Sequence, residues 1–193
     1  MERDPEDEED GCRTGRPGTG PLAYVDTSVL VAAYAPSDPI HKQSRTFLAN
    51  SKPTKVISPL TFEELSSVIA RTEEEMQLPL LIQKEPPGRR TRAVVEYIIR
   101  DSGLTLASEL GSSRIRIGNR SLNIPLEYSK AASLAPLLKL RALDLLHLAY
   151  AHLIDKLQFS VTSFVTGDEA IISKAQDIHK SLEIAIRHPK DKI

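Results

Sequence analysis

Four acidic residues of this chain stand where predicted strands end or predicted helices begin. Asp26 follows the short apolar run at residues 22–25, and Asp168 follows the strand-like stretch Ser-Phe-Val-Thr at residues 163–166. Glu64 and Asp144 lie in the first turns of two predicted helices. In a parallel sheet, strand ends and the starts of the following helices share one edge, so all four side chains can converge there. Each acid alone could be a helix cap, a partner of the helix dipole or a turn residue. Together they predict a carboxylate cluster.

Carboxylates crowded together at the edge of a core repel one another strongly. At about 4 Å and an effective dielectric constant of roughly 20, one pair costs about 4 kcal/mol. Such a cluster takes up protons or binds a hard cation, and Mg²⁺ and Mn²⁺ prefer oxygen ligands. Our hypothesis is that Asp26, Asp144 and Asp168 hold the main metal ion. Glu64 would orient a water molecule or a second ion.

The elements that must position these acids follow from the alternation of apolar runs and amphipathic segments. Short apolar runs predict strands at residues 22–25, 55–58, 104–106, 159–165 and 182–186. Helical patterns separate them at residues 41–50, 93–100, 126–138, 141–156 and 169–176, with further helices after residues 26 and 58. Strands that alternate with helices predict an α/β fold, a three-layer α/β/α sandwich with a mostly parallel sheet of four to five strands.

Several boundaries in this pattern are ambiguous or irregular. The helix after the second strand could begin with Ser58 as its cap and Pro59 at the first helical position, or with a capping box made by Thr61 and Glu64. Residues 76–92 are expected to be irregular, because they contain Pro79 and the sequence Pro-Pro-Gly at 86–88. Pro136 is expected to bend or break the helix at 126–138.

An inserted β-hairpin is predicted at about residues 112–125. Arginine and isoleucine alternate at residues 114–117, and Gly-Asn at 118–119 is a two-residue turn typical of hairpins. Ile115 and Ile117 would then share one face, with Arg114 and Arg116 on the other. Candidate phosphate-binding side chains are Arg114, Arg116 and Arg120 of the hairpin and Arg89, Arg90 and Arg92 of the preceding loop. The alternative is that these arginines form only a solvated charged face.

Composition limits the class of protein. With 193 residues, of which 40% are hydrophobic, the chain can form one sizeable core, and no apolar run is long enough to cross a membrane. The single cysteine, Cys12, cannot form an internal disulfide, so a cytoplasmic location is expected. The absence of tryptophan and the scarcity of aromatic residues argue against a stacking platform for single-stranded nucleic acid.

The charge of the chain is unevenly distributed. Residues 1–20 carry seven acids and three arginines, a net charge of −4, so the rest carries +3 of the total of −1. This segment has almost no apolar residue and is predicted to be a disordered tail. The expected organisation is therefore the tail at 1–20, a single domain at 21–187 with the hairpin insert, and a polar tail at 188–193.

Four stretches resemble, in order, the sequence blocks of the PIN-domain family, and most closely those of VapC-type ribonucleases of prokaryotic toxin–antitoxin pairs. The blocks are Ala-Tyr-Val-Asp-Thr-Ser-Val-Leu at 23–30, Ser-Pro-Leu-Thr-Phe-Glu-Glu-Leu at 58–65, Ala-Leu-Asp-Leu-Leu-His-Leu-Ala at 142–149 and Phe-Val-Thr-Gly-Asp at 164–168. The ordered set spans residues 22 to about 187. The acidic leader is not part of the family pattern, and the hairpin is longer than the minimal VapC pattern.

The resemblance implies an α/β/α fold and a ribonuclease that requires Mg²⁺ or Mn²⁺. The family's acidic quartet carries over onto Asp26, Glu64, Asp144 and Asp168, with Thr27 or Ser28 and Thr166 as supporting hydroxyls. The implied partners are an RNA substrate, a cognate antitoxin protein and a second copy of the chain in a homodimer.

Two questions have alternative answers: whether His147 binds the metal ion or packs its helix, and whether the protein is an enzyme or only a binding module. His147 lies one helical turn after Asp144 and could share a metal ion with it, but hard-metal sites seldom use imidazole, so we expect a helix-packing residue. A PIN-like module that binds RNA or a partner without turnover is the alternative to an enzyme. A module that only binds has no need for four mutually repelling acids, so the quartet favours the nuclease.

Overall fold

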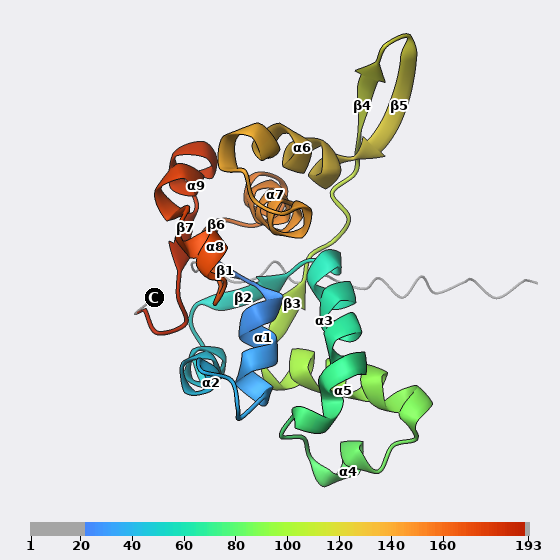
Figure 1. Cartoon of the computed structure of the whole chain (residues 1–193), viewed down its shortest axis with the longest axis vertical. Helices are drawn as coiled ribbons and strands as arrows, with labels where there is room; N and C mark the ends of the chain where they lie inside the picture. Colours follow the sequence, from blue (N-terminus) through green and yellow to red (C-terminus); the bar gives the residue numbers. More distant parts are fainter. Residues whose placement is uncertain (1–21, 192–193) are drawn as a thin grey trace, which may run out of the picture.

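A computed structural model describes residues 22–191 of the chain. Its centre is a sheet of five parallel strands in the order β3-β2-β1-β6-β7 (Figure 1). The strands of this sheet are β1 (Leu22–Val25), β2 (Thr54–Ile57), β3 (Leu104–Leu106), β6 (Val161–Val165) and β7 (Ala185–Arg187). Helices cover both faces, which confirms the predicted α/β/α sandwich.

The order of the strands reverses beside β1. From β1 the chain moves outward through β2 and β3, and it later returns to the other side of β1 to form β6 and β7. Ligands of open α/β sheets bind outside the carboxyl ends of the strands at such a reversal. Asp26 follows β1 directly, and its backbone N–H donates to the carbonyl of Val165 at the end of β6 over 3.0 Å. The first predicted acid therefore stands at the reversal.

Two apolar layers hold the sheet. The four residues of β1 are all buried and alternate, with Leu22 and Tyr24 facing one helix layer and Ala23 and Val25 facing the other. The first layer contains α6 (Leu126–Leu138), α7 (Ala142–Leu157), α8 (Glu169–Ile172) and α9 (Ala175–Leu182). The second layer contains α1 (Thr27–Tyr34), α2 (His41–Ala49), α3 (Pro59–Thr72) and α5 (Pro87–Asp101).

The start of α3 resolves the ambiguity left by the sequence. The Ser58 side chain accepts a hydrogen bond from the backbone N–H of Thr61 over 3.2 Å, and Pro59 occupies the first helical position. The reciprocal bond, from the Ser58 backbone N–H to the Thr61 hydroxyl, completes a capping box. Glu64 is thus free of capping, and its carboxylate is available to the site.

Three expected boundaries were wrong. Residues 76–92 contain α4 (Leu80–Gln83) and the first turns of α5, because Pro87 lies at the start of a helix, where its missing N–H costs nothing. Helix α6 is not broken at Pro136, because this proline lies in the last turn and removes only one intrahelical hydrogen bond. The segment predicted as one helix at 169–176 is divided between α8 and α9, and α9 extends to Leu182, so β7 begins later than expected.

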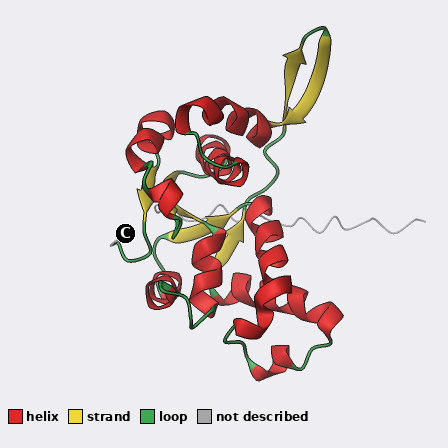
Figure 2. Ribbon diagram, viewed as in Figure 1, coloured by secondary structure: helices red, strands yellow, loops and turns green. Residues whose placement is uncertain are grey.

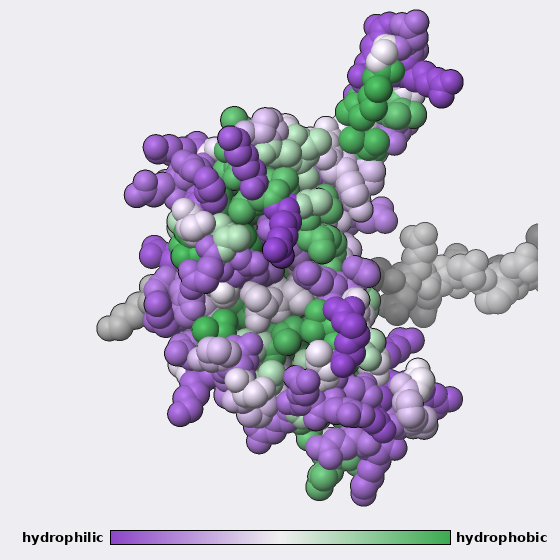
Figure 3. All heavy atoms as spheres, in the orientation of Figure 1, coloured by the Kyte–Doolittle hydropathy of each residue, from purple (hydrophilic) through white to green (hydrophobic). Residues whose placement is uncertain are grey.

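The predicted hairpin is present, as β4 (Ser112–Ile117) and β5 (Arg120–Pro125). It leaves the sheet at the carboxyl end of β3 and projects away from the body beyond α6 (Figures 1 and 2). Ile117 and Leu122 are largely exposed, and hydrophobic atoms are visible along the hairpin in Figure 3. The predicted tail at residues 1–20 lies outside the described residues. Within the part that the structure describes, no helix is both long and apolar enough to cross a membrane.

Candidate metal centre

Asp26 is held at the end of β1 by two hydroxyl groups. Its Oδ2 atom accepts hydrogen bonds from Ser28 Oγ over 2.7 Å and from Thr166 Oγ1 over 2.6 Å. Asp26 immediately precedes α1, but its carboxylate makes no capping hydrogen bond to that helix. Within residues 22–191, no hydrogen bond involves Oδ1. One oxygen of this buried acid is therefore fixed, and the other is free to bind a ligand.

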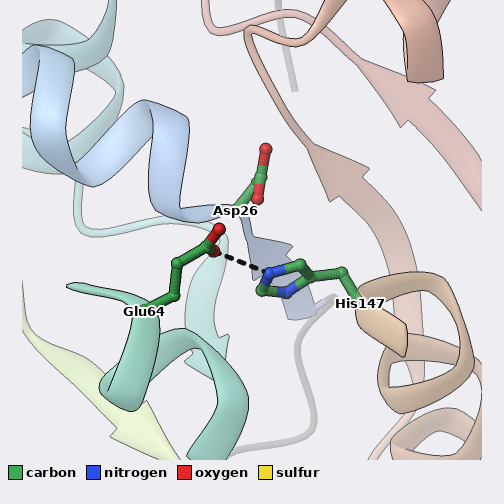
Figure 4. Close-up of side chains that lie close together, drawn as sticks. All are labelled: Asp26, Glu64 and His147. Carbon is green, nitrogen blue, oxygen red and sulfur yellow. Dashed lines mark hydrogen bonds and ion pairs between the residues drawn. The ribbon is translucent and has the colours of Figure 1, made fainter. Parts of the chain in front are cut away.

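Glu64 is held in the same way, on the second turn of α3. Its Oε2 atom accepts hydrogen bonds from Thr27 Oγ1 over 2.6 Å and from His147 Nε2 over 2.9 Å. These two donors, His147 first, lower the pKa of the Glu64 carboxyl group against the opposing effect of partial burial. Figure 4 shows Glu64 and His147 facing each other beside Asp26. Glu64 is thus an ionised carboxylate with one oxygen, Oε1, outside the hydrogen bonds among the described residues.

Asp144 is the least satisfied of the four acids. It lies in the first turn of α7, and its Oδ2 atom is buried without a hydrogen-bond partner among residues 22–191. Burial raises the pKa of the Asp144 carboxyl group, and the nearby charges of Asp168 and Asp26 raise it further. The amide of Arg141 offsets this only in part. A buried carboxylate oxygen without a donor, beside two other acids, has the environment that a cation would stabilise.

Asp168 is fixed by the turn between β6 and α8. The sequence predicts only a turn at Asp168, but its Oδ1 atom also accepts a hydrogen bond from the Ala170 N–H over 2.7 Å and so caps α8. Its own N–H donates to Thr166 Oγ1 over 2.9 Å, and the N–H of Gly167 donates to Ser28 Oγ over 3.0 Å. The two hydroxyls that fix Asp26 therefore also fix the turn that carries Asp168.

The hydroxyl groups that were predicted to support the site donate hydrogen bonds to two different acids, Asp26 and Glu64. Ser28 and Thr166 serve Asp26, whereas Thr27 serves Glu64. The sequence left Thr27 and Ser28 as alternatives, and both donate to a site carboxylate. Adjacent hydroxyls at the start of a helix point in different directions, so each can serve a different acid.

Three candidate donor atoms of the site lie close together. One oxygen of Asp26, one oxygen of Glu64 and a ring nitrogen of His147 all lie within 4.8 Å of one another. Asp144 and Asp168 are not part of this group of three. The charges of Asp168 and Asp26 nevertheless both raise the pKa of the Asp144 carboxyl group. Oxygen donors in excess, one of them buried and unpaired, fit a hard divalent cation.

His147 is the site residue whose role the sequence did not identify. His147 is 2% exposed, as expected of a residue that packs its helix against the core. Its ring also links Glu64 to the hydroxyl of Tyr24, which lies 2.9 Å from Nδ1. The spacing of one helical turn between Asp144 and His147 was the available signal, because it places both side chains on one side of α7.

The candidate phosphate-binding arginines differ in their surroundings. In the hairpin, Arg114 and Arg116 share a face, but Arg120 pairs with Ile117 and so lies on the isoleucine face. Arg90 forms an ion pair with Glu73, and Arg92 forms one with its helical neighbour Glu96. The exposed Arg114 and Arg116 are therefore the better-placed pair for a polyanion.

The fold and the site together define an α/β/α protein with an acidic cluster where the strand order reverses. The sequence model described as PIN domain matches residues 23–175, and the chain belongs to this family. PIN domains are generally nucleases, which supports a hydrolase that acts on nucleic acid. Among solved structures, the chain is similar to the crystal structure of VapBC2 from Rickettsia felis bound to a DNA fragment from their promoter, with 13% identity, a TM-score of 0.48 and coverage of 86% of this chain and 98% of that chain. No curated protein matches the chain.

Proposed function

We propose that this protein is a ribonuclease that requires a divalent cation and hydrolyses RNA phosphodiester bonds at the four-carboxylate site, formed by Asp26, Glu64, Asp144 and Asp168. The observation that carries the proposal is the unequal use of the carboxylate oxygens. Asp26 and Glu64 each engage one oxygen in two hydrogen bonds, while their second oxygens have no bond among the described residues. Asp144 keeps a buried oxygen unpaired. This arrangement suits a cation better than it suits a purely structural network.

The chain's own residues have separate tasks in this proposal. Asp26, Asp144 and Asp168 would hold Mg²⁺ or Mn²⁺, and Glu64 would orient the attacking water or bind a second ion. When bound, the cation lowers the pKa of a water molecule and neutralises charge on the phosphate. Ser28 and Thr166 keep Asp26 in one rotamer before the substrate arrives, which is the preorganisation that catalysis requires.

The expected products carry 5′-phosphate and 3′-hydroxyl ends. A cyclic phosphate would require the 2′-hydroxyl as nucleophile, usually with two groups that exchange protons. Within residues 22–191, His147 is the one histidine that contacts a site carboxylate, and it is 2% exposed. Water is therefore the proposed nucleophile, and the 2′-hydroxyl has no proposed role.

The hairpin supplies a second, more distant contact for the RNA. Arg114 and Arg116 project from one face of an arm that carries no acidic residue between residues 112 and 125. Arginine binds phosphate with paired N–H donors, and such contacts fix the position of a nucleic acid without reading its sequence. Arg120 would contribute from the opposite face, near the tip.

The finer assignment, to a VapC-type toxin, depends on the sequence blocks described above. It would give the protein a cognate antitoxin as partner, and homodimerisation is a further prediction. Co-purification with the product of a neighbouring gene and measurement of the mass in solution would test these two partners. The cytoplasmic location stays a prediction from the single cysteine.

The direct test compares the wild type with Asp144→Asn on structured and unstructured RNA, first with Mn²⁺ and then with EDTA. We expect cleavage by the wild type that EDTA abolishes, and a loss of at least about 100-fold in the variant. Asp177→Asn is the matched control, because Asp177 occupies the same third position of α9, away from the site. Equal cleavage by wild type and Asp144→Asn would refute the proposal. Binding of RNA and Mn²⁺ without any cleavage would favour the alternative of a binding module without turnover.

A further inference from the structure

A buried tyrosine–histidine pair lies behind Glu64, and the proposed mechanism does not yet use it. Tyr24 is 0% exposed and His147 is 2% exposed. The Tyr24 hydroxyl lies 2.9 Å from His147 Nδ1, and His147 Nε2 lies 2.9 Å from Glu64 Oε2. The three side chains therefore form a continuous line of hydrogen bonds from the sheet to the site carboxylate.

The hydrogen-bond partners determine which atom donates in each bond. Glu64 Oε2 already accepts a hydrogen bond from Thr27 Oγ1, and a carboxylate oxygen is an acceptor for His147 Nε2 as well, so Nε2 carries the proton. When the Tyr24 hydroxyl donates to Nδ1, that nitrogen is an acceptor and the ring holds its proton on Nε2. The line thus has one direction, with each group donating toward Glu64.

Tyr24 is itself fixed from several sides. Its oxygen lies 2.7 Å from Ser58 Oγ and 3.0 Å from Thr61 Oγ1, the two hydroxyls of the α3 capping box. Its ring stacks on Phe164 of β6 with the centroids 5.1 Å apart. The tyrosine therefore connects β1 and β6 with the start of α3 and, through His147, with α7. Asp26 follows β1 and Asp168 lies in the turn after β6, while α3 and α7 carry Glu64 and Asp144.

We propose that His147 is a positioning residue for Glu64, and that Tyr24 selects the tautomer and the orientation of His147. The inference rests on the proposed function, since it assigns these residues to the same site. His147 gives Oε2 its second hydrogen bond, so the carboxylate cannot rotate freely and Oε1 is presented to the cation or to the attacking water. Groups that orient a metal-binding carboxylate typically contribute 10–100-fold in metal affinity or activity.

A role for His147 as a direct metal ligand is the competing interpretation of the same contacts. Its ring nitrogen does lie within 4.8 Å of the Asp26 and Glu64 oxygens. However, Nε2 carries the proton that Glu64 accepts, and Nδ1 is engaged with Tyr24, so neither nitrogen offers a lone pair to an ion. Mg²⁺ and Mn²⁺ also prefer oxygen donors.

Four variants separate positioning from packing. Tyr24→Phe removes only the hydroxyl group. Its matched control is Tyr34→Phe, because Tyr34 is a second buried tyrosine and lies outside the site. The Tyr34 hydroxyl donates to Asp101 Oδ2 over 2.6 Å and lies 3.0 Å from Ser102 Oγ. His147→Leu removes both hydrogen bonds, whereas the amide of His147→Gln can still donate to Glu64. We expect kcat and Mn²⁺ affinity to fall about 10–100-fold in His147→Leu, with partial recovery in His147→Gln and little change in KM for RNA. Tyr24→Phe should lose activity, while Tyr34→Phe should lose a similar amount of stability and keep its activity.

Nitrogen-15 NMR of the histidine ring tests the inference without an activity measurement. In the cation-free protein we expect a proton on Nε2 and a bare Nδ1 that accepts from Tyr24, and in Tyr24→Phe we expect this preference for Nε2 to weaken. Addition of Mg²⁺ should leave the Nε2 proton in place. A deprotonated, metal-shifted Nε2 would overturn the positioning role in favour of a ligand. Full activity and Mn²⁺ affinity in His147→Leu would overturn it in favour of packing alone. A wild type that neither cleaves RNA nor binds Mn²⁺, yet shows the expected tautomer, would instead contradict the proposed function.

Discussion

Replacement of Asp144 by Asn should stabilise the protein when no cation is present. Burial and the charges of Asp168 and Asp26 raise the pKa of Asp144, so its ionised form costs folding free energy at neutral pH. Two carboxylates about 4 Å apart would cost about 4 kcal/mol at most, and the partial exposure of Asp144 reduces the net effect to about 1 kcal/mol. For a domain of this size, a gain of about 1 kcal/mol raises Tm by about 2–4 °C.

A divalent cation should make the wild type more stable than Asp144→Asn. With Mn²⁺ at about 100 times its Kd, the wild type gains about 2.7 kcal/mol, whereas Asp144→Asn, which lacks a ligand, gains much less. Thermal unfolding at pH 7 in EDTA and in Mn²⁺ measures both states. The variant should unfold at the higher temperature in EDTA and at the lower temperature in Mn²⁺.

The pH dependence of stability tests whether the raised pKa of Asp144 causes the difference between the wild type and Asp144→Asn. Because the folded pKa of Asp144 is raised, the stability that its protonated form contributes is complete below the unfolded pKa and is lost as the pH rises through the folded pKa. The advantage of Asp144→Asn in EDTA should therefore shrink as the solution is acidified. Asp177→Asn, at the equivalent helix position beside Lys174, should show no gain at any pH. An Asp144→Asn variant that is less stable than the wild type in EDTA would refute the electrostatic reasoning.

Three further predictions concern the turn after β6 and the hairpin. Thr166→Val removes a donor to the carboxylate at the end of β1 and should weaken Mn²⁺ binding about 10–100-fold in calorimetry, with the fold retained by circular dichroism. Gly167→Ala would bring a Cβ atom against Ile40 Cδ1, the end of a half-buried flexible side chain that can move aside, so it should cost about 1 kcal/mol at most in urea unfolding, and Ile40→Val should recover this loss. Replacement of Arg114 and Arg116 by Gln should reduce the slope of log Kd against log salt for single-stranded RNA by about 1.4, and an unchanged slope would remove the hairpin from RNA binding.

The positions of the four acids could be predicted because they depend on local sequence signals. Asp26 and Asp168 follow apolar strands, and Glu64 and Asp144 lie in the first turns of helices. A parallel sheet brings these places to one edge whatever the detailed packing. The sequence also predicted the hydroxyl neighbours, because Thr27, Ser28 and Thr166 are adjacent to the acids or within two residues of them.

The hydrogen-bonded pair of Tyr24 and His147 could not be predicted in this way. The two residues are 123 positions apart, and their contact depends on which β1 residues face α7 and on the rotation of α7 about its axis. Sequence periodicity gives the face of a helix only approximately. The helical structure within residues 76–92 is hidden for a different reason, because a proline can either interrupt a helix or begin one, and Pro87 begins α5. The pairing of Arg120 with Ile117 is a direct consequence of the two-residue turn at 118–119, so the hairpin pattern contains enough information to predict it.

Crystals of the wild type soaked in Mn²⁺, with diffraction recorded at the manganese absorption edge, test the central claim most directly. The claim predicts an anomalous peak within about 2.3 Å of oxygens from at least two of Asp26, Asp144 and Asp168, with Glu64 beside it. His147 should remain hydrogen-bonded to Glu64. A peak elsewhere, or no peak at Mn²⁺ concentrations that support cleavage, would contradict the assignment of these four carboxylates to a metal centre.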